Sequence, residues 1–270
     1  MIGLSYGNFQ SGAGFDPDAS AVIAQMTANG STPTEVRQSI INQLVLDLKG
    51  LGNTGSTDIW SSLDVLQIYA AEDAIQAKTE WINADGTFDA VEINAPSFTT
   101  DVGYSSSSNK GIDTSFNPSS SVFNYTLNNN SFGVYAQSGA SASYLCGANP
   151  TAISGSAIRN LLSDSDQTNN SSTYWLDSFD SLTGLQTNSR SNSTTVALYN
   201  NTSSKNGNKS STSSSIPNFN FYVLGRNLNG VLSNTHLGST VSLFYVGANI
   251  TGDINQFYNS LNAYLTAVAP

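Results

Sequence analysis

Residues Val241-Ser242-Leu243-Phe244-Tyr245-Val246-Gly247, together with the segment that follows them, give the strongest indication of the architecture of this 270-residue chain. A short apolar run of this kind predicts a strand. The following segment repeats apolar residues at steps of three and four, which places them on one stripe of a helix. These residues are Ile254, Phe257, Tyr258, Leu261, Tyr264, Leu265 and Val268. Thr251 stands at the expected N-cap, so we expect a strand and a capped helix that docks on a sheet.

The N-terminal third shows helical periodicity. We expect a short helix over residues 18–28 and a longer one that starts at the capping box 32–35 and ends at Gly50. A further helix is expected from about residue 56 to residue 66, with one or two more turns over 72–78. The segment before residue 15 is rich in Gly and Ser and is expected to be an extended arm.

From residue 87 the helical spacing gives way to short segments in which apolar and polar residues alternate. Gly, Asn, Pro and Ser separate these segments, which is typical of a β-sandwich. The expected strands are 89–93, 98–100, 111–115, 132–137, 143–145, 183–189, 195–199, 219–224 and 242–246. The Ser-rich tract 202–215 contains Asn206-Gly207, which predicts a type I′ turn, so we expect an elongated surface hairpin there.

Composition excludes several classes of protein. Charged residues make up only 10% of the chain, the net charge is −10, and the nine basic residues are scattered, which argues against a nucleic-acid partner. The single cysteine, Cys146, excludes an internal disulfide and a zinc site built on thiolates, and is expected to be buried. Neither a signal peptide nor an apolar run long enough for a membrane helix is apparent, so we expect synthesis in a cytoplasm and no membrane insertion.

Catalytic groups are scarce. His236 is the only histidine and is expected in an exposed turn, and Glu92 is the last glutamate. A glycosidase needs two carboxylates across a cleft. The candidates outside the helical region are Glu92, Asp101, Asp113, Asp164, Asp166, Asp177 and Asp180. We therefore expect that the chain is not an enzyme, with a glycosidase as the less favoured alternative.

Two acidic segments are candidates for ligand binding. Asp164-Ser165-Asp166 begins like a calcium loop but lacks the glycine and the distal glutamate, so no cofactor is expected, with calcium as the alternative. Rings beside carboxylates and amides are typical of sugar-binding surfaces. The candidate glycan contacts are Trp175, Asp177, Phe179 and Asp180, although Trp175 and Phe179 would equally suit a hydrophobic core.

Four stretches resemble, in the same order, a family of tailed-bacteriophage structural proteins that carry a laminin-G/concanavalin-A-like jelly-roll domain. The first stretch comprises 21–27, 33–49 and 60–73, the second 94–104 and 112–118, the third 195–200, and the fourth is the C-terminal strand and helix. The resemblance extends over roughly residues 15–268. The family pattern fixes no catalytic residues, so none are transferred.

The resemblance implies a mainly β jelly-roll sandwich with an N-terminal helical segment and a C-terminal helix. The expected organisation is an arm at 1–14, a helical attachment segment at 15–80 and a jelly roll at 81–270. The implied function is a non-enzymatic virion component, such as a head decoration, head fibre, collar or tail fibre, which displays its lectin-like domain outward. Its implied partners are other virion proteins, further copies of the chain and a host-surface glycan. The alternative is a carbohydrate-binding receptor or adhesion module.

Overall fold

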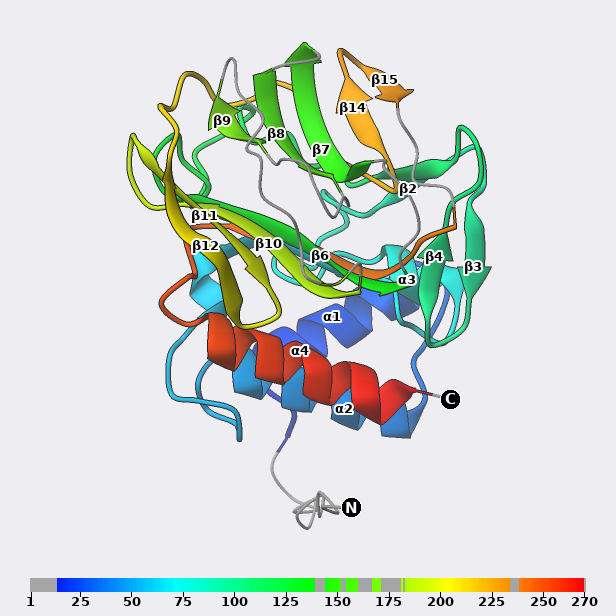
Figure 1. Ribbon diagram of the computed structural model, residues 1–270. Helices are drawn as coiled ribbons and strands as arrows, with labels where there is room; N and C mark the ends of the chain where they lie inside the picture. Colours follow the sequence, from blue (N-terminus) through cyan, green and yellow to red (C-terminus); the bar gives the residue numbers. More distant parts are fainter. Residues whose placement is uncertain are drawn as a thin grey trace.

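A computed structural model describes residues 14–138, 144–151, 154–159, 167–170, 181, 183–233 and 238–269. In this part of the chain, a layer of helices, a first sheet and a second sheet are stacked on one another (Figure 1). The helical elements are α1 (Pro17–Ala28), α2 (Glu35–Leu48), a 3-10 turn at Trp60–Ser62, α3 (Ala74–Lys78) and α4 (Ile254–Val268).

Each sheet contains eight of the described strands. Sheet A has the order β12 (Ser203–Ser210), β11 (Thr195–Asn200), β10 (Gly184–Arg190), β6 (Asn130–Ser138), β16 (Thr240–Gly247), β4 (Gly103–Ser105) and β3 (Ser97–Thr99), and β1 (Leu63–Ile68) also pairs with β16. Sheet B has the order β15 (Val231–Ser233), β14 (Arg226–Leu228), β7 (Tyr144–Thr151), β13 (Tyr222–Val223), β5 (Gly111–Asp113) and β2 (Val91–Ile93). In addition, β8 (Ser154–Arg159) pairs with β7, and β9 (Gln167–Asn170) pairs with β8.

The C-terminal strand β16 is the centre of sheet A, as its apolar sequence predicts. It pairs with β6 on one side and with β1 and β4 on the other. Leu243 and Tyr245 point to the helices, whereas Phe244 and Val246 point to the core between the sheets. Because both faces of the strand are buried, its apolar residues run consecutively instead of alternating with polar ones.

Helix α4 lies along sheet A beside α2 and buries its predicted apolar stripe (Figure 1). Phe257 is fully buried, and its ring centroid lies 4.6 Å from that of Tyr245 in an edge-to-face contact. Gln256 Nε2 donates hydrogen bonds to the carbonyl oxygens of Asp47 and Thr57, which connects α4 to the end of α2. The C-terminal segment is therefore docked on the sheet by apolar packing and by buried polar contacts.

The buried side chain of Arg37 connects the helical layer to sheet A and its loops. Its Nη1 donates to the carbonyl oxygen of Ala70 at 3.1 Å and to Tyr264 Oη at 3.2 Å, and its Nη2 forms an ion pair with Asp101. Burial tends to lower the pKa of this guanidinium, but the neighbouring Tyr264 and Asp101 outweigh that effect and raise it. Arg37 of α2 thus links three other parts of the fold, namely the segment after β1, helix α4 and the loop after β3.

The predicted helix over 56–66 is wrong. Only Trp60–Ser62 forms a 3-10 turn, and Leu63–Ile68 is strand β1, which is buried along its whole length. Leu63, Leu66 and Ile68 pack against the helices, whereas Val65 packs between the sheets. A strand that is buried on both faces has apolar residues at helical spacings as well, and periodicity alone cannot separate the two.

Two predicted helix starts are displaced. Helix α2 begins after Thr34, whose hydroxyl accepts from the backbone N–H of Arg37, and not after Thr32. Helix α4 begins after Asp253, whose side chain makes no capping bond, and not after Thr251. The fold class predicted from the sequence, a mainly β sandwich of the jelly-roll type with helices at both ends, is confirmed.

The predicted hairpin turn at Asn206-Gly207 is also wrong. Residues Ser203–Ser210 form the single strand β12, and the register between β11 and β12 shifts between Val196 and Leu198. The turn that joins these two strands contains Asn201, with φ of 55°. The Asn-Gly pair at 206–207 therefore lies within an irregular edge strand, where a bulge absorbs it.

Candidate functional site

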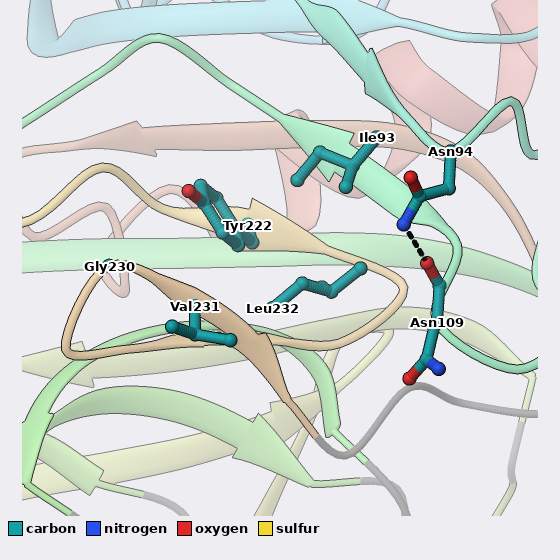
Figure 2. A pocket seen from close by; sticks show the side chains of 7 residues that line it. All are labelled: Ile93, Asn94, Asn109, Tyr222, Gly230, Val231 and Leu232. Atoms are coloured by element: carbon teal, nitrogen blue, oxygen red, sulfur yellow. Dashed lines mark hydrogen bonds between the residues drawn. The ribbon is translucent and has the colours of Figure 1, made fainter.

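An open depression of about 530 Å³ lies on the face of sheet B that points away from sheet A (Figure 2). Val223 is buried between the sheets, and the neighbouring Tyr222 points to the opposite face, where its side chain is half-exposed. The residues that line the depression are Ile93, Asn94, Asn109, Tyr222, Gly230, Val231 and Leu232. They come from four separate segments of the chain.

A two-residue turn forms one wall of the depression. Leu228 pairs with Val231, so Asn229 and Gly230 are the turn residues, with φ values of 51° and 86°. Positive φ at both positions is the requirement of a type I′ turn, which Asn-Gly meets. The N–H of Gly230 donates to Asn227 Oδ1 at 2.7 Å, which anchors the turn. The turn displays Val231, whose side chain is 65% exposed.

Gly111, at the start of β5, lets two residues of the lining, Ile93 and Leu232, approach β5 closely. Gly111 pairs with Ile93 of β2. A methyl group at Gly111 would lie 2.8 Å from the carbonyl oxygen of Val223 and 3.2 Å from Leu232 Cδ1. The hairpin that carries Leu232 thus approaches β5 closely because position 111 has no side chain.

Two asparagines form the rim of the depression. Asn94 and Asn109 are exposed and have φ values of 57° and 60°, a left-handed conformation that asparagine tolerates better than most residues. Asn94 Nδ2 donates a 2.7 Å hydrogen bond to the carbonyl oxygen of Asn109 (Figure 2). Among the described residues, none donates a hydrogen bond to Asn94 Oδ1. That oxygen is an acceptor available at the rim.

Tyr222 contributes an aromatic ring and a hydroxyl group. Burial and the nearby charge of Asp113 raise the pKa of Tyr222, so the phenol keeps its proton at neutral pH. Asp113 pairs with Tyr222 across β5 and β13. Its Oδ1 accepts from the backbone N–H of Ser115 at 2.8 Å and from Asn220 Nδ2 at 2.9 Å. The described residues that line the depression offer aromatic, aliphatic and amide groups, and none of these residues carries a charged side chain.

The glycan contacts predicted from the sequence, Trp175, Asp177, Phe179 and Asp180, lie outside the described residues, as do Asp164, Asp166 and His236. The depression on sheet B was missed by sequence reasoning. Its best sequence signal is Asn229-Gly230, the Asn-Gly pair that does form a type I′ turn.

The remaining candidate carboxylates have separate structural contacts. Glu92 accepts a 2.8 Å hydrogen bond from Tyr104 Oη and lies 3.9 Å from Lys78 Nζ. Asp101 pairs with Arg37, and Asp113 has the partners described above. Each of these three carboxylates supports a different part of the fold.

Glu80 is a buried carboxyl group that sequence reasoning did not select. It accepts backbone N–H groups of Leu66 at 3.1 Å, Ile82 at 2.6 Å and Asn83 at 2.8 Å. Burial raises its pKa to about 7, although these hydrogen bonds favour the charged form. It joins strand β1 to the following loop, away from the depression, which indicates a structural role.

The described residues contain neither a cluster of metal ligands nor a membrane-spanning helix. Among them, no group of three His, Cys, Asp or Glu side chains is placed to hold a metal ion. Cys146 is buried between the sheets, as its position in a strand predicts. No helix in the described part of the chain is long and apolar enough to span a bilayer.

The structure resembles sialidases in fold. No protein-family model and no curated protein sequence matches the chain. A Trypanosoma rangeli sialidase in complex with sialic acid superposes with a TM-score of 0.52 at 10% identity, over 85% of this chain and 39% of that chain. Another T. rangeli sialidase structure gives 0.50 at 8% identity, over 84% and 39%. Domain 4 of a Geobacillus stearothermophilus arabinanase in complex with arabinotriose gives 0.41 at 12% identity, over 73% and 98%.

The prediction that the chain is not an enzyme is contradicted by this comparison, because structures that superpose with TM-scores of 0.50 and 0.52 are sialidases. The scarcity of histidine and glutamate in the sequence was the reason for that prediction, and it does not exclude a fold that glycosidases also contain. The chain spans only about two fifths of the length of these sialidases, so the similarity concerns the fold of that part.

Proposed function

We propose that this chain is a carbohydrate-binding domain and that the depression on sheet B is its binding site. The observation that carries the proposal is the half-exposed ring of Tyr222 in an open depression, with the exposed aliphatic wall at Val231 on the same side and the asparagine rim on the opposite side (Figure 2). Sugar rings present C–H groups on their faces and hydroxyl groups on their edges. An aromatic ring contacts the former, and amides bind the latter.

The preorganisation of the depression supports the proposal. Asn94, Asn109, Asn229 and Gly230 have positive φ values, and turn hydrogen bonds or strand pairing hold the segments that carry them. Groups that are fixed before binding lose less conformational entropy when the ligand arrives. Non-glycine residues in left-handed backbone conformations also cluster at the functional sites of proteins.

The arrangement of layers is compatible with the virion role that the sequence resemblance implies. Helices α1, α2 and α4 cover the face of sheet A opposite to sheet B, so attachment through the helices would leave the depression accessible (Figure 1). Our finer proposal is that the domain is displayed on a bacteriophage particle in several copies. Deletion of residues 1–14 is then expected to prevent incorporation into particles and to leave the melting temperature unchanged. Normal incorporation of that variant would reject the proposed attachment.

Binding of immobilised glycans to the purified chain tests the carbohydrate-binding proposal. Tyr222→Ala removes the ring and is expected to weaken binding by about tenfold or more, because ring stacking contributes about 1–1.5 kcal/mol and its area is lost as well. Val122→Ala is the matched control, because Val122 is 98% exposed and lies outside the depression.

Melting temperatures of both variants show whether the fold is intact. Equal glycan affinity in the wild type, Tyr222→Ala and Val122→Ala would place the binding site elsewhere. Absence of binding to any glycan would reject the proposed function.

A further inference from the structure

We infer that the depression selects neutral sugars and discriminates against acidic ones such as sialic acid. This inference rests on the proposed function of the same site and specifies its ligand class. The similarity to sialidases would by itself suggest that the ligand is an acidic sugar. The relative affinity for neutral and acidic sugars therefore distinguishes that suggestion from our inference. The inference rests on a carboxylate near the depression, and on arginine and lysine side chains that do not line it.

The first observation is the carboxylate of Asp113. On sheet B, Asp113 pairs with Tyr222 on one side and with Val91 on the other, and these three residues alternate with the buried Ile112 and Val223. Asp113 therefore shares the outer face with the Tyr222 ring. A sugar carboxylate stacked on this ring would lie close to a like charge, which is unfavourable at the partly desolvated surface of a binding site.

The second observation concerns arginine, whose planar group pairs with carboxylates in two parallel hydrogen bonds. None of the four arginines of the chain lines the depression. Arg37 is paired with Asp101, and Arg190 Nη1 donates to the carbonyl oxygen of Ser211 at 2.7 Å. The guanidinium groups of the other two arginines contact the same tyrosine ring. Arg226 and Arg159 lie over the ring of Tyr144, at 4.2 Å and 5.8 Å from its centroid.

Lysine does not take the place of arginine in the lining. Lys110 is half-buried and precedes β5, next to Asn109, but it does not line the depression. Lys78 lies near Glu92, and Lys49 pairs with Asp16 and Asp18 beside the helices. The lining offers a ligand the Tyr222 hydroxyl and the amide oxygen of Asn94, which pair well with neutral hydroxyls.

The test compares matched ligands on the whole chain. Titration calorimetry or an immobilised-glycan assay measures a panel of neutral oligosaccharides and the same oligosaccharides with a terminal sialic acid. We expect each sialylated ligand to bind at least about tenfold more weakly than its neutral counterpart at low salt, because the carboxylate of Asp113 repels a second negative charge on the same face of the sheet.

Asp113→Asn is the variant that isolates the charge. It retains the Oδ1 acceptor for Ser115 and Asn220, so the fold is expected to be preserved. The difference between neutral and sialylated ligands should shrink severalfold in this variant, while affinity for neutral ligands changes by less than about twofold.

The outcomes separate this inference from the proposed function. Equal or tighter binding of sialylated ligands, with loss of both classes in Tyr222→Ala, would overturn the inference and retain the site. Tighter sialylated binding that is lost in Lys110→Gln would overturn it and identify the cation responsible. An unchanged preference in Asp113→Asn would also overturn the inference. Failure of every glycan to bind would reject the proposed function itself.

Discussion

The helical side of the molecule and the outer face of sheet B use their residues in opposite ways. On the helical side, Phe257 is fully buried, and polar groups such as Gln256 and Arg37 have hydrogen-bond partners inside the protein. On the outer face of sheet B, Tyr222 is half-exposed and Val231 is 65% exposed. The first surface uses its apolar residues for stability, whereas the second leaves them available for a ligand.

The largest expected effect lies on the helical side. Phe257→Ala removes the ring that contacts Tyr245 and leaves a cavity between α4 and sheet A, so the free energy of unfolding should fall by about 3–5 kcal/mol. Chemical denaturation monitored by circular dichroism measures this change. Asn255→Ala and Asn259→Ala, on the exposed face of the same helix, are the controls. Small and equal effects of all three variants would show that α4 does not depend on this packing.

A second effect on the buried side depends on pH. Burial raises the pKa of Glu80 to about 7 in the folded chain, above its usual 4.5. Between these two values the folded state binds more protons than the unfolded state, so stability falls as pH rises from about 4.5 to 7. We expect a loss of about 1–3 kcal/mol across this window.

Glu80→Gln isolates this titration, because it removes the proton exchange and keeps an oxygen acceptor for the loop. The difference in unfolding free energy between the wild type and this variant should depend on pH between about 5 and 7. Denaturation curves at closely spaced pH values measure it. A constant difference across that range would show that Glu80 does not titrate there.

The smallest expected effect on stability lies at the depression. Val231→Ala removes side-chain atoms that are mostly exposed, so the free energy of unfolding should change by no more than about 0.5 kcal/mol. The same variant should weaken glycan binding, because Val231 forms one wall beside Tyr222. A large loss of stability in Val231→Ala would remove the contrast between the two surfaces.

The sequence predicts the regular parts of the fold and misses the assembled site, for identifiable reasons. Residues 240–268 carry local signals, namely a consecutive apolar run and then a stripe with helical spacing, and both elements form as expected. Strand β1 was misread because Leu63 and Leu66 also fit a helical stripe. At Asn206-Gly207 and Asn229-Gly230 the same turn signal had opposite outcomes, since the pairing of the flanking strands decides whether the turn forms.

The depression could not be predicted in the same way. Its lining comes from residues 93–94, 109, 222 and 230–232, and the sequence between them contains no signal that brings them together. Sheet pairing does so: β2 pairs with β5 and β5 with β13, and the hairpin of β14 and β15 joins them through β7. The four residues that are predicted to contact glycan all lie within one segment of six residues, 175–180, because aromatic and acidic clusters are recognisable only when they are local in sequence.

Backbone-amide NMR during titration with a neutral oligosaccharide shows directly whether the depression on sheet B binds sugar. We expect chemical-shift changes that saturate together at Asn94, Asn109, Tyr222 and residues 230–232, with α4 unaffected. Changes confined to residues 175–180 would rule out the depression and would assign glycan binding to the cluster predicted from the sequence. A spectrum that does not change at saturating ligand would contradict carbohydrate binding altogether.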